Sequence, residues 1–192
     1  MIALTRPECP NPEALAQGNY KHPLNKEALR ESTSGKCMYC ESKIEHISFA
    51  QVEHIKPKSK FPELEFSWEK LGYCCQHCNT KKGDKFDEAI PFVDPYTENP
   101  EDYLVFLDHF IKTKKQSSER GDYTIKEIDL NRSRLVDRRK DKIDGIKKLI
   151  DIASSLNESL RNQVIAELKT EAEKDREYSA AVKSFLLTQG IM

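Results

Sequence analysis

Two Cys-x-x-Cys pairs constrain this chain more than any other feature of its sequence. They are Cys37/Cys40 and Cys75/Cys78, and residues 41–74 separate them. Each pair supplies two thiolates from one tight turn, and four thiolates suit the tetrahedral coordination of Zn²⁺. Chance clustering and a redox Cys-x-x-Cys are the alternatives, but two such pairs in one chain favour a metal site. We therefore predict a structural zinc site on these four cysteines.

The start of the chain and the remaining cysteines bear on the compartment. Residues 1–8 lack the basic start and the long apolar run of a secretory signal. No apolar run approaches the roughly 20 residues that span a bilayer, so we expect no membrane-spanning helix. We expect a cytoplasmic protein, in which thiols stay reduced. Cys74 and Cys9 stand outside the pairs, and we expect a small buried thiol and a surface thiol.

The charge of the chain limits how it can bind a polyanion. Its 31 Lys and Arg against 32 Asp and Glu give a net charge of −1, so binding needs a local basic patch. Residues 112–142 contain 11 Lys and Arg against 6 Asp and Glu. An ordinary solvated face is the alternative for these groups. Lysines also lie within the insert and directly after the second cysteine pair, on both sides of the groups considered below. We expect five of them to bind nucleic acid: Lys56, Lys58, Lys81, Lys82 and Lys85.

Local signals in the first half predict mostly short elements. Three prolines and a glycine indicate an irregular arm over residues 1–20. Residues 24–32 are predicted to be helical, with Asn25 as a possible cap. Weak alternation of apolar and polar residues over 43–56 predicts a β-hairpin.

The second half of the chain is predicted to turn from short strands to helices. Asn79 is a good cap for a helix over 79–90. Residues 103–107 and 123–125 are predicted to be strands, joined by a charged loop. Apolar residues then recur at helical intervals, which predicts three helices near residues 131–153, 157–174 and 176–188.

The insert between the cysteine pairs, and the residue directly after the second pair, carry groups that suit phosphodiester hydrolysis. Glu53 offers a carboxylate and Asn79 an amide carbonyl, and a hard cation such as Mg²⁺ or Mn²⁺ prefers oxygen ligands. The imidazole of His54 can take a proton from water, because its pKa lies near working pH. Adjacent residues of a strand face opposite sides, so a bulge or bend near Pro57 must bring Glu53 and His54 to one site.

Four motifs in order along the chain resemble an HNH endonuclease of the ββα-metal type, over about residues 36–86. They are Cys37-x-x-Cys40, Val52-Glu53-His54-Ile55-x-Pro57, Trp68-Glu69-x-Leu71 and Cys75-x-x-Cys78-Asn79-x-x-Lys82-Gly83. The resemblance implies that His54 is the general base. It also implies that Glu53 and Asn79 bind the catalytic metal, and that the four cysteines bind structural Zn²⁺.

The segment beyond residue 91 is similar to HNH proteins of bacterial defence modules. The matching runs are Phe92-Val93-Asp94-Pro95, residues 99–103, and residues 130–139. The chain is most like the HNH subunit of the Septu anti-phage system (PtuB-like), which is also found beside retrons. That resemblance implies a role in antiviral defence, an ABC-type ATPase as partner, and DNA as substrate, with RNA not excluded.

One position departs from the family pattern, and three side chains are assigned to other roles. Lys70 stands where the family usually has an asparagine that orients the loop of the catalytic histidine. A backbone carbonyl could orient the ring of His54 instead, and Lys70 could contact a phosphate. We expect His46 to be a surface residue of the hairpin rather than part of the site, His77 to point to solvent, and Trp68 to anchor the core.

The residues leave three functions open. The first is a metal-dependent endonuclease. The second is a catalytically degenerate zinc-ribbon subunit that binds nucleic acid or protein, and the third is an interaction subunit whose helical half docks an ATPase. A bare ribbon explains the cysteines but not Glu53, His54 and Asn79, which favours the enzyme. Restriction of modified DNA and cleavage by a mobile element are further possible roles.

The expected fold class is α+β, with a zinc-stabilised ββα-metal (HNH) core and a helical C-terminal part. We expect residues 1–35 to form an N-terminal arm and short helix, and residues 36–90 the nuclease core. Residues 91–192 are expected to form a β-containing linker region and the helical part.

Overall fold

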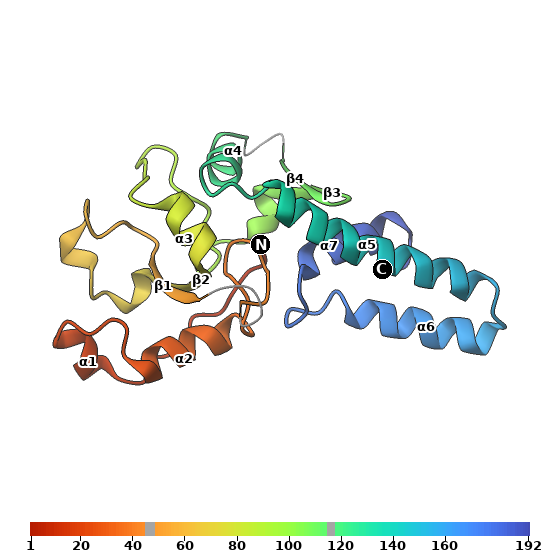
Figure 1. Cartoon of the computed structure of the whole chain (residues 1–192), viewed down its shortest axis with the longest axis horizontal. Helices are drawn as coiled ribbons and strands as arrows, with labels where there is room; N and C mark the ends of the chain where they lie inside the picture. The colour runs from red at the N-terminus through yellow and green to blue at the C-terminus, as the bar shows by residue number, and fades with distance from the viewer. Residues whose placement is uncertain (45–48, 115–117) are drawn as a thin grey trace.

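The computed structural model describes residues 1–44, 49–114 and 118–192. It is an elongated molecule, with the short elements of the first half of the chain at one end and the long C-terminal helices at the other (Figure 1). The strands are β1 (Ala50–His54), β2 (Leu71–Cys75), β3 (Leu104–Leu107) and β4 (Phe110–Thr113). The helices are α1 (Pro12–Ala16), α2 (Pro23–Ser32), α3 (Gln76–Lys82), α4 (Ser118–Glu127), α5 (Ser133–Ser154), α6 (Glu158–Thr170) and α7 (Ser179–Thr188).

Strands β1 and β2 form an antiparallel pair that carries the insert between the cysteine pairs. Their register places Ala50 opposite Cys75 and His54 opposite Leu71. The hairpin predicted over residues 43–56 is therefore wrong in the described part of the chain, because β1 pairs with a strand from across the insert. Alternation can indicate a strand, but it does not identify the partner. Residues 45–48 of that prediction lie outside the described residues.

Helix α3 lies against both strands and completes the ββα unit (Figure 1). It begins at Gln76, and the Sγ of Cys75 caps it by accepting a hydrogen bond from the amide of Cys78 at 3.5 Å. The helix predicted over 79–90 was misplaced, and Asn79 lies inside α3 rather than at its start. Gly83 ends the helix with a φ of 53°, a conformation that glycine adopts at low cost.

The N-terminal arm is more ordered than its prolines indicate. It contains α1, and α2 confirms the helix predicted over 24–32. Asn25 is not the cap of α2, since it is fully buried within the helix. Its amide nitrogen donates to the carbonyl of Asn11 at 2.9 Å, and its oxygen accepts from the amide of Asn11 at 2.9 Å. These two bonds fasten the arm to α2.

Strands β3 and β4 form a second antiparallel hairpin. The strand predicted over 123–125 is wrong, because these residues belong to α4. Gly121, Thr124 and Ile128 are buried at the spacing of one helical face. The hydroxyl of Thr124 accepts a hydrogen bond from the amide of Val93 at 3.0 Å. Residues 123–125 form a helix because the burial of this face outweighs the β propensity of Tyr, Thr and Ile.

The three helices predicted at the end of the chain are confirmed as α5, α6 and α7. They enclose a small core of their own, formed by Ile143, Ile146, Leu168, Val182, Phe185 and Leu186. No described helix is long and apolar enough to cross a membrane.

A buried polar cluster joins the helical part to the region of the paired cysteines. The carboxylate of Glu41 accepts hydrogen bonds from the hydroxyl of Ser179 at 2.9 Å and from the amide of Ala180 at 3.2 Å. The Nζ of Lys36 lies 3.6 Å from the same carboxylate and donates to the carbonyl of Arg176 at 2.9 Å. The start of α7 is thereby held against the first cysteine turn. Together these elements confirm the α+β fold with a helical C-terminal part.

Candidate zinc centre and active site

The four paired cysteines lie together at the end of the β1–β2 sheet where α3 begins. Their Sγ atoms all lie within 4.8 Å of one another, and all four side chains are buried. A tetrahedral zinc with Zn–S bonds of about 2.3 Å needs sulfurs about 3.8 Å apart. The Sγ atoms of Cys40 and Cys75 are 3.9 Å apart, so the donor set fits Zn²⁺.

A guanidinium from the helical part supports this cluster. The Nη1 of Arg132 donates to the Sγ of Cys78 at 3.7 Å. Burial opposes the charge on Arg132, but the negative sulfurs of Cys78 and Cys40 outweigh it and raise the pKa of Arg132. Four thiolates around a divalent zinc leave two negative charges, which such a cation offsets.

The two unpaired cysteines have separate environments. Cys74 is fully buried, which agrees with the small buried thiol expected from the sequence. Cys9 is only partly exposed, and its Sγ donates to the Oδ1 of Asn25 at 3.7 Å. The expected surface thiol is therefore packed into the N-terminal arm.

His54 ends β1, and its ring is held by a backbone carbonyl. The Nε2 of His54 lies 3.0 Å from the carbonyl oxygen of Glu65. A carbonyl only accepts, so Nε2 carries the proton and Nδ1 is left with its lone pair. Within the described residues Nδ1 has no hydrogen-bond partner. Burial, with Lys58 and Lys82 nearby, lowers the pKa of His54 although the Glu65 carbonyl opposes this. The ring is thus a neutral base with one free nitrogen.

Glu53 points to the opposite face of β1 and is 2% exposed. Its Oε1 lies 2.6 Å from the Nζ of Lys82, and the hydroxyl of Tyr39 donates to it at 3.4 Å. Burial raises the pKa of Glu53 and Lys82 opposes that rise. Strand β1 is regular from Ala50 to His54, so Glu53 and His54 face opposite sides within it. The bulge or bend expected near Pro57 is not part of this strand.

Asn79 and Lys82 stand three positions apart on α3, which places them on one face of the helix. Lys82 is 1% exposed, and its Nζ also donates to the carbonyl of His54 at 2.8 Å. Asn79 is half-buried, and its side chain has no hydrogen-bond partner in the described parts of the chain. The structure therefore brings Glu53 and Lys82 together, and places Asn79 one turn away on the helix that covers them.

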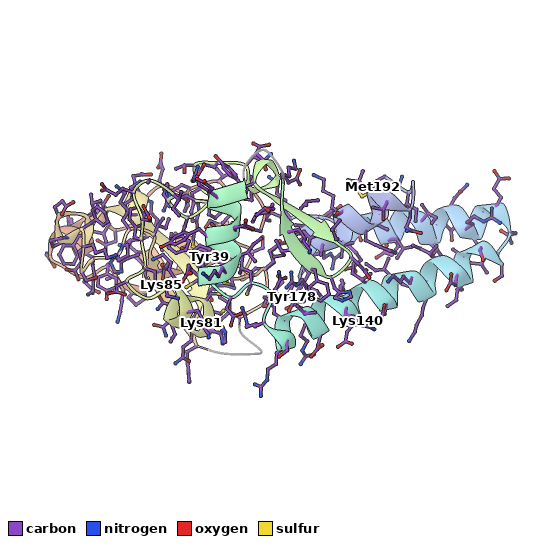
Figure 2. The ribbon with its side chains drawn as sticks, turned by 90° about the horizontal axis from the view of Figure 1, so that it is seen from above. Tyr39, Lys81, Lys85, Lys140, Tyr178 and Met192 are labelled. Atoms are coloured by element: carbon purple, nitrogen blue, oxygen red, sulfur yellow. The ribbon has the colours of Figure 1, made fainter. Side chains whose placement is uncertain are left out.

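The other lysines predicted to bind nucleic acid are not buried. Lys81 and Lys85 are exposed, and both are labelled below the buried Tyr39 in Figure 2. Their Nζ atoms lie 3.4 Å from Asp129 and 2.9 Å from Glu127, respectively. Lys58 pairs with Glu65, and Lys56 is half-buried over the ring of Phe61. Lys82 differs from the other lysines, because its ammonium group is buried. A contact to a phosphate would need that group at the surface.

An open cleft of about 690 Å³ lies beside the cysteine cluster. Two arginines of the basic segment 112–142, Arg134 and Arg138 on α5, line this cleft. Carboxylates line the cleft as well. Its lining residues are Ser42, Lys43, His77, Arg132, Arg134, Leu135, Asp137, Arg138, Asp141, Glu177 and Tyr178.

Three side chains assigned to other roles are placed as follows. His77 is exposed to solvent, as expected. Trp68 is partly buried against the core, and its Nε1 donates to the carbonyl of Pro7 at 2.8 Å, so it also anchors the arm. His46 lies outside the described residues.

Tyr20, which no sequence motif indicated, lies against His54 in the structure. The two ring centroids are 4.7 Å apart and the planes meet at 74°. Tyr20 lies in the irregular arm and outside every motif. No local pattern in the sequence therefore predicts its contact with His54.

Comparison with known proteins agrees with this arrangement. The HNH endonuclease family model matches residues 37–85. The chain is 32% identical to a Septu protein PtuB of Bacillus thuringiensis, over 97% of this chain and 82% of that protein. It is 30% identical to a Septu protein PtuB of Bacillus mycoides (strain KBAB4), over 81% of this chain and 64% of that protein. A ββα unit on a four-cysteine cluster, followed by a helical part over which the likeness continues, places this chain in the PtuB family of Septu proteins with an HNH endonuclease domain.

Proposed function

We propose that this protein is a metal-dependent endonuclease that hydrolyses phosphodiester bonds of DNA, as the effector of a bacterial anti-phage defence module. The observation that carries the proposal is the state of His54. Its Nε2 donates to the carbonyl of Glu65, and its Nδ1 has no hydrogen-bond partner among the residues that the structure describes. A neutral imidazole with one free nitrogen is suited to accept a proton from water. The cysteine cluster supports the proposal, because it fixes the far end of the same sheet.

The proposed reaction is direct attack by water. Nδ1 of His54 takes one proton as the water oxygen bonds to phosphorus. The bond from phosphorus to the 3′ oxygen breaks, and that oxygen leaves with the electron pair. The Glu65 carbonyl holds the ring and stabilises the imidazolium that forms, because Nε2–H still donates to it. No covalent enzyme intermediate is needed.

The proposed catalytic metal is Mg²⁺ or Mn²⁺, bound by Glu53 and Asn79. Their carboxylate and amide oxygens are the donors that such cations prefer. When bound, the metal would supply charge stabilisation to the phosphate and to the leaving oxygen. Glu53 holds Lys82 at 2.6 Å on the face of β1 opposite His54. Ligation by Glu53 at the same site as His54 therefore requires this ion pair to open and the carboxylate to turn toward the His54 side.

The proposed substrate contacts are to backbone phosphates, through Lys56, Lys58, Lys81 and Lys85. Phosphate contacts supply most non-specific affinity and carry little sequence information. Lys82 has a different proposed role, as the internal cation that neutralises Glu53.

We further propose that the protein acts in the cytoplasm with an ABC-type ATPase as partner. The similarity to Septu proteins over most of the chain supports a defence role. A partner that controls cleavage would protect the DNA of the host cell.

A catalytically degenerate zinc-ribbon subunit is the second candidate. The enclosed Glu53–Lys82 ion pair favours it, since this pair occupies the carboxylate that a metal would need. Lys70, in place of the asparagine usual in the family, favours it as well.

Cleavage of supercoiled plasmid distinguishes the two candidates. We expect nicking with Mg²⁺ or Mn²⁺, none with EDTA, and a loss of about 10²–10⁴-fold in His54→Ala. His109→Ala, which alters a histidine at the β3–β4 turn, is the matched control and keeps activity. Equal activity in His54→Ala would reject His54 as the base. Inactivity of the wild type, both alone and with its ATPase partner, would favour the binding subunit.

A further inference from the structure

The half-buried ring of His54 is contacted by two segments that lie far apart in the sequence. One is the loop that carries Lys58, Glu65 and Phe66, and the other is the turn that carries Tyr20. The Tyr20 ring meets His54 edge to face at 4.7 Å, and the ring of Phe66 lies 6.3 Å from that of Tyr20. Edge-to-face contacts between flat rings have a preferred geometry, so Tyr20 restricts the rotation of the imidazole.

Tyr20 is itself held in place by local structure. The amide of Asn19 donates to the carbonyl of Ala14 at 2.8 Å, and the amide of His22 donates to the carbonyl of Asn19 at 3.3 Å. Gly18 has a φ of 82°, and a Cβ there would lie 3.5 Å from the ring of Phe66. The turn is thus closed on both sides of Tyr20 and sits against the second segment.

Charged groups fasten the two segments to each other. The Nζ of Lys58 lies 5.1 Å from the centre of the Tyr20 ring and 2.7 Å from the Oε1 of Glu65. Lys58 therefore bridges Tyr20 to the residue whose carbonyl accepts from His54. The contacts form a closed cycle of four residues: Tyr20, His54, Glu65 and Lys58.

We infer that Tyr20 is a positioning residue of the candidate active site, whose ring holds the His54 imidazole so that Nε2–H stays on the Glu65 carbonyl and Nδ1 faces the reaction. The hydrogen bond alone leaves the ring free to tilt, and a tilted ring lengthens or breaks the bond from Nε2–H to the Glu65 carbonyl. The edge contact from Tyr20 removes that freedom. The inference rests on the proposed nuclease function for its catalytic consequence, but not for its structural one.

The structural consequence is tested without substrate, by long-range ¹H–¹⁵N NMR of the histidine rings. The chain has five histidines, and loss of one set of signals in His54→Gln assigns those of His54. We expect a single Nε2–H tautomer in the wild type and in Tyr20→Phe, which keeps the ring. We expect mixed tautomers in Tyr20→Ala. Tyr103→Ala, a half-buried tyrosine elsewhere in the fold, should leave the His54 signals unchanged.

The catalytic consequence is tested by cleavage kinetics on the same variants. Misplacement of a base lowers kcat rather than raising KM, and we expect a fall on the order of 10-fold or more in Tyr20→Ala. Tyr20→Phe should restore kcat. Zinc content and unfolding temperature show whether Tyr20→Ala is folded, and Tyr20→Leu replaces it if it is not.

Two results would overturn the inference. One is a wild-type His54 tautomer in Tyr20→Ala or Tyr20→Leu. The other is loss of kcat in Tyr20→Phe equal to that in Tyr20→Ala, which would assign the role to the hydroxyl instead of the ring. A wild type that is inactive both alone and with its ATPase partner, but shows the expected NMR pattern, would reject the nuclease function and retain the positioning role.

Discussion

At the scale of single residues, the Glu53–Lys82 ion pair is buried in the interior of the ββα unit. Two opposite charges lie 2.6 Å apart with almost no exposure, between β1 and α3. Burial of such a pair costs desolvation, which the mutual attraction and further hydrogen bonds offset. Lys82 makes one of those bonds to the carbonyl of His54. The pair therefore joins the helix, the strand and the backbone of the candidate base.

Lys82→Met should destabilise the folded protein by about 3–5 kcal/mol, because it leaves the Glu53 carboxylate buried without a partner. The Lys82→Met/Glu53→Gln double variant should recover much of that loss. Urea unfolding of the zinc-loaded protein measures both. Lys81→Met, on the exposed side of the same helix, should change stability by no more than about 0.5 kcal/mol. An equal loss in the double variant would mean that Lys82 acts by packing and not by charge.

At the scale of elements, an ionic contact reinforces the packing of α4 on the irregular chain before β3. The guanidinium of Arg120 on α4 donates to both carboxylate oxygens of Glu98 at 2.7 Å, and to the carbonyl of Pro91 at 2.9 Å. Burial raises the pKa of Glu98, but the hydrogen bonds from Arg120 and Tyr103 outweigh it and lower that pKa. This contact fixes α4 to the irregular chain that precedes β3.

Arg120→Met should lower stability at pH 7 by about 1 kcal/mol, since the pair is only partly buried. A carboxyl with a lowered folded pKa contributes stability above its unfolded pKa, and that contribution is lost as the pH falls through the folded pKa. The difference between variant and wild type should thus stay constant from pH 7 to pH 5. Denaturant unfolding across that range measures it. A difference that shrinks by pH 5 would contradict the lowered pKa of Glu98.

At the scale of the whole molecule, the cysteine cluster joins the halves of the chain. The cysteines come from both ends of the insert, Arg132 approaches them from just before α5, and Glu41 beside them holds the start of α7. The long helices thus depend on the ββα unit for their placement, although their own core lies apart from it.

Removal of zinc should unfold the ββα unit, because the binding energy of a structural zinc is also folding energy. A strong chelator, or Cys75→Ser, should lower zinc content, solubility and unfolding temperature together. Part of the far-UV helical signal should remain, since the core of α5–α7 contains no cysteine. Cys9→Ser is the matched control and should keep one zinc per chain. A folded Cys75→Ser protein without zinc would contradict a structural role for the metal.

The sequence by itself determined the features that depend on short spacing or on regular periodicity. Two Cys-x-x-Cys turns predict a four-cysteine cluster whatever structure the residues between them adopt. The apolar residues of α5, α6 and α7 recur at helical intervals, so those helices were predictable from local pattern. The resemblance of residues 36–86 to HNH endonucleases likewise rests on motifs read along the chain.

Only the tertiary structure decided which strands pair, which charges are buried and which distant residues meet. β1 pairs with β2 across the insert, residues 123–125 join a helix, and Lys82 turns inward to Glu53. Tyr20 reaches His54 from an arm that carries no motif. Each of these outcomes depends on packing between segments far apart in the sequence. The local propensity of one segment does not contain the free energy of that packing.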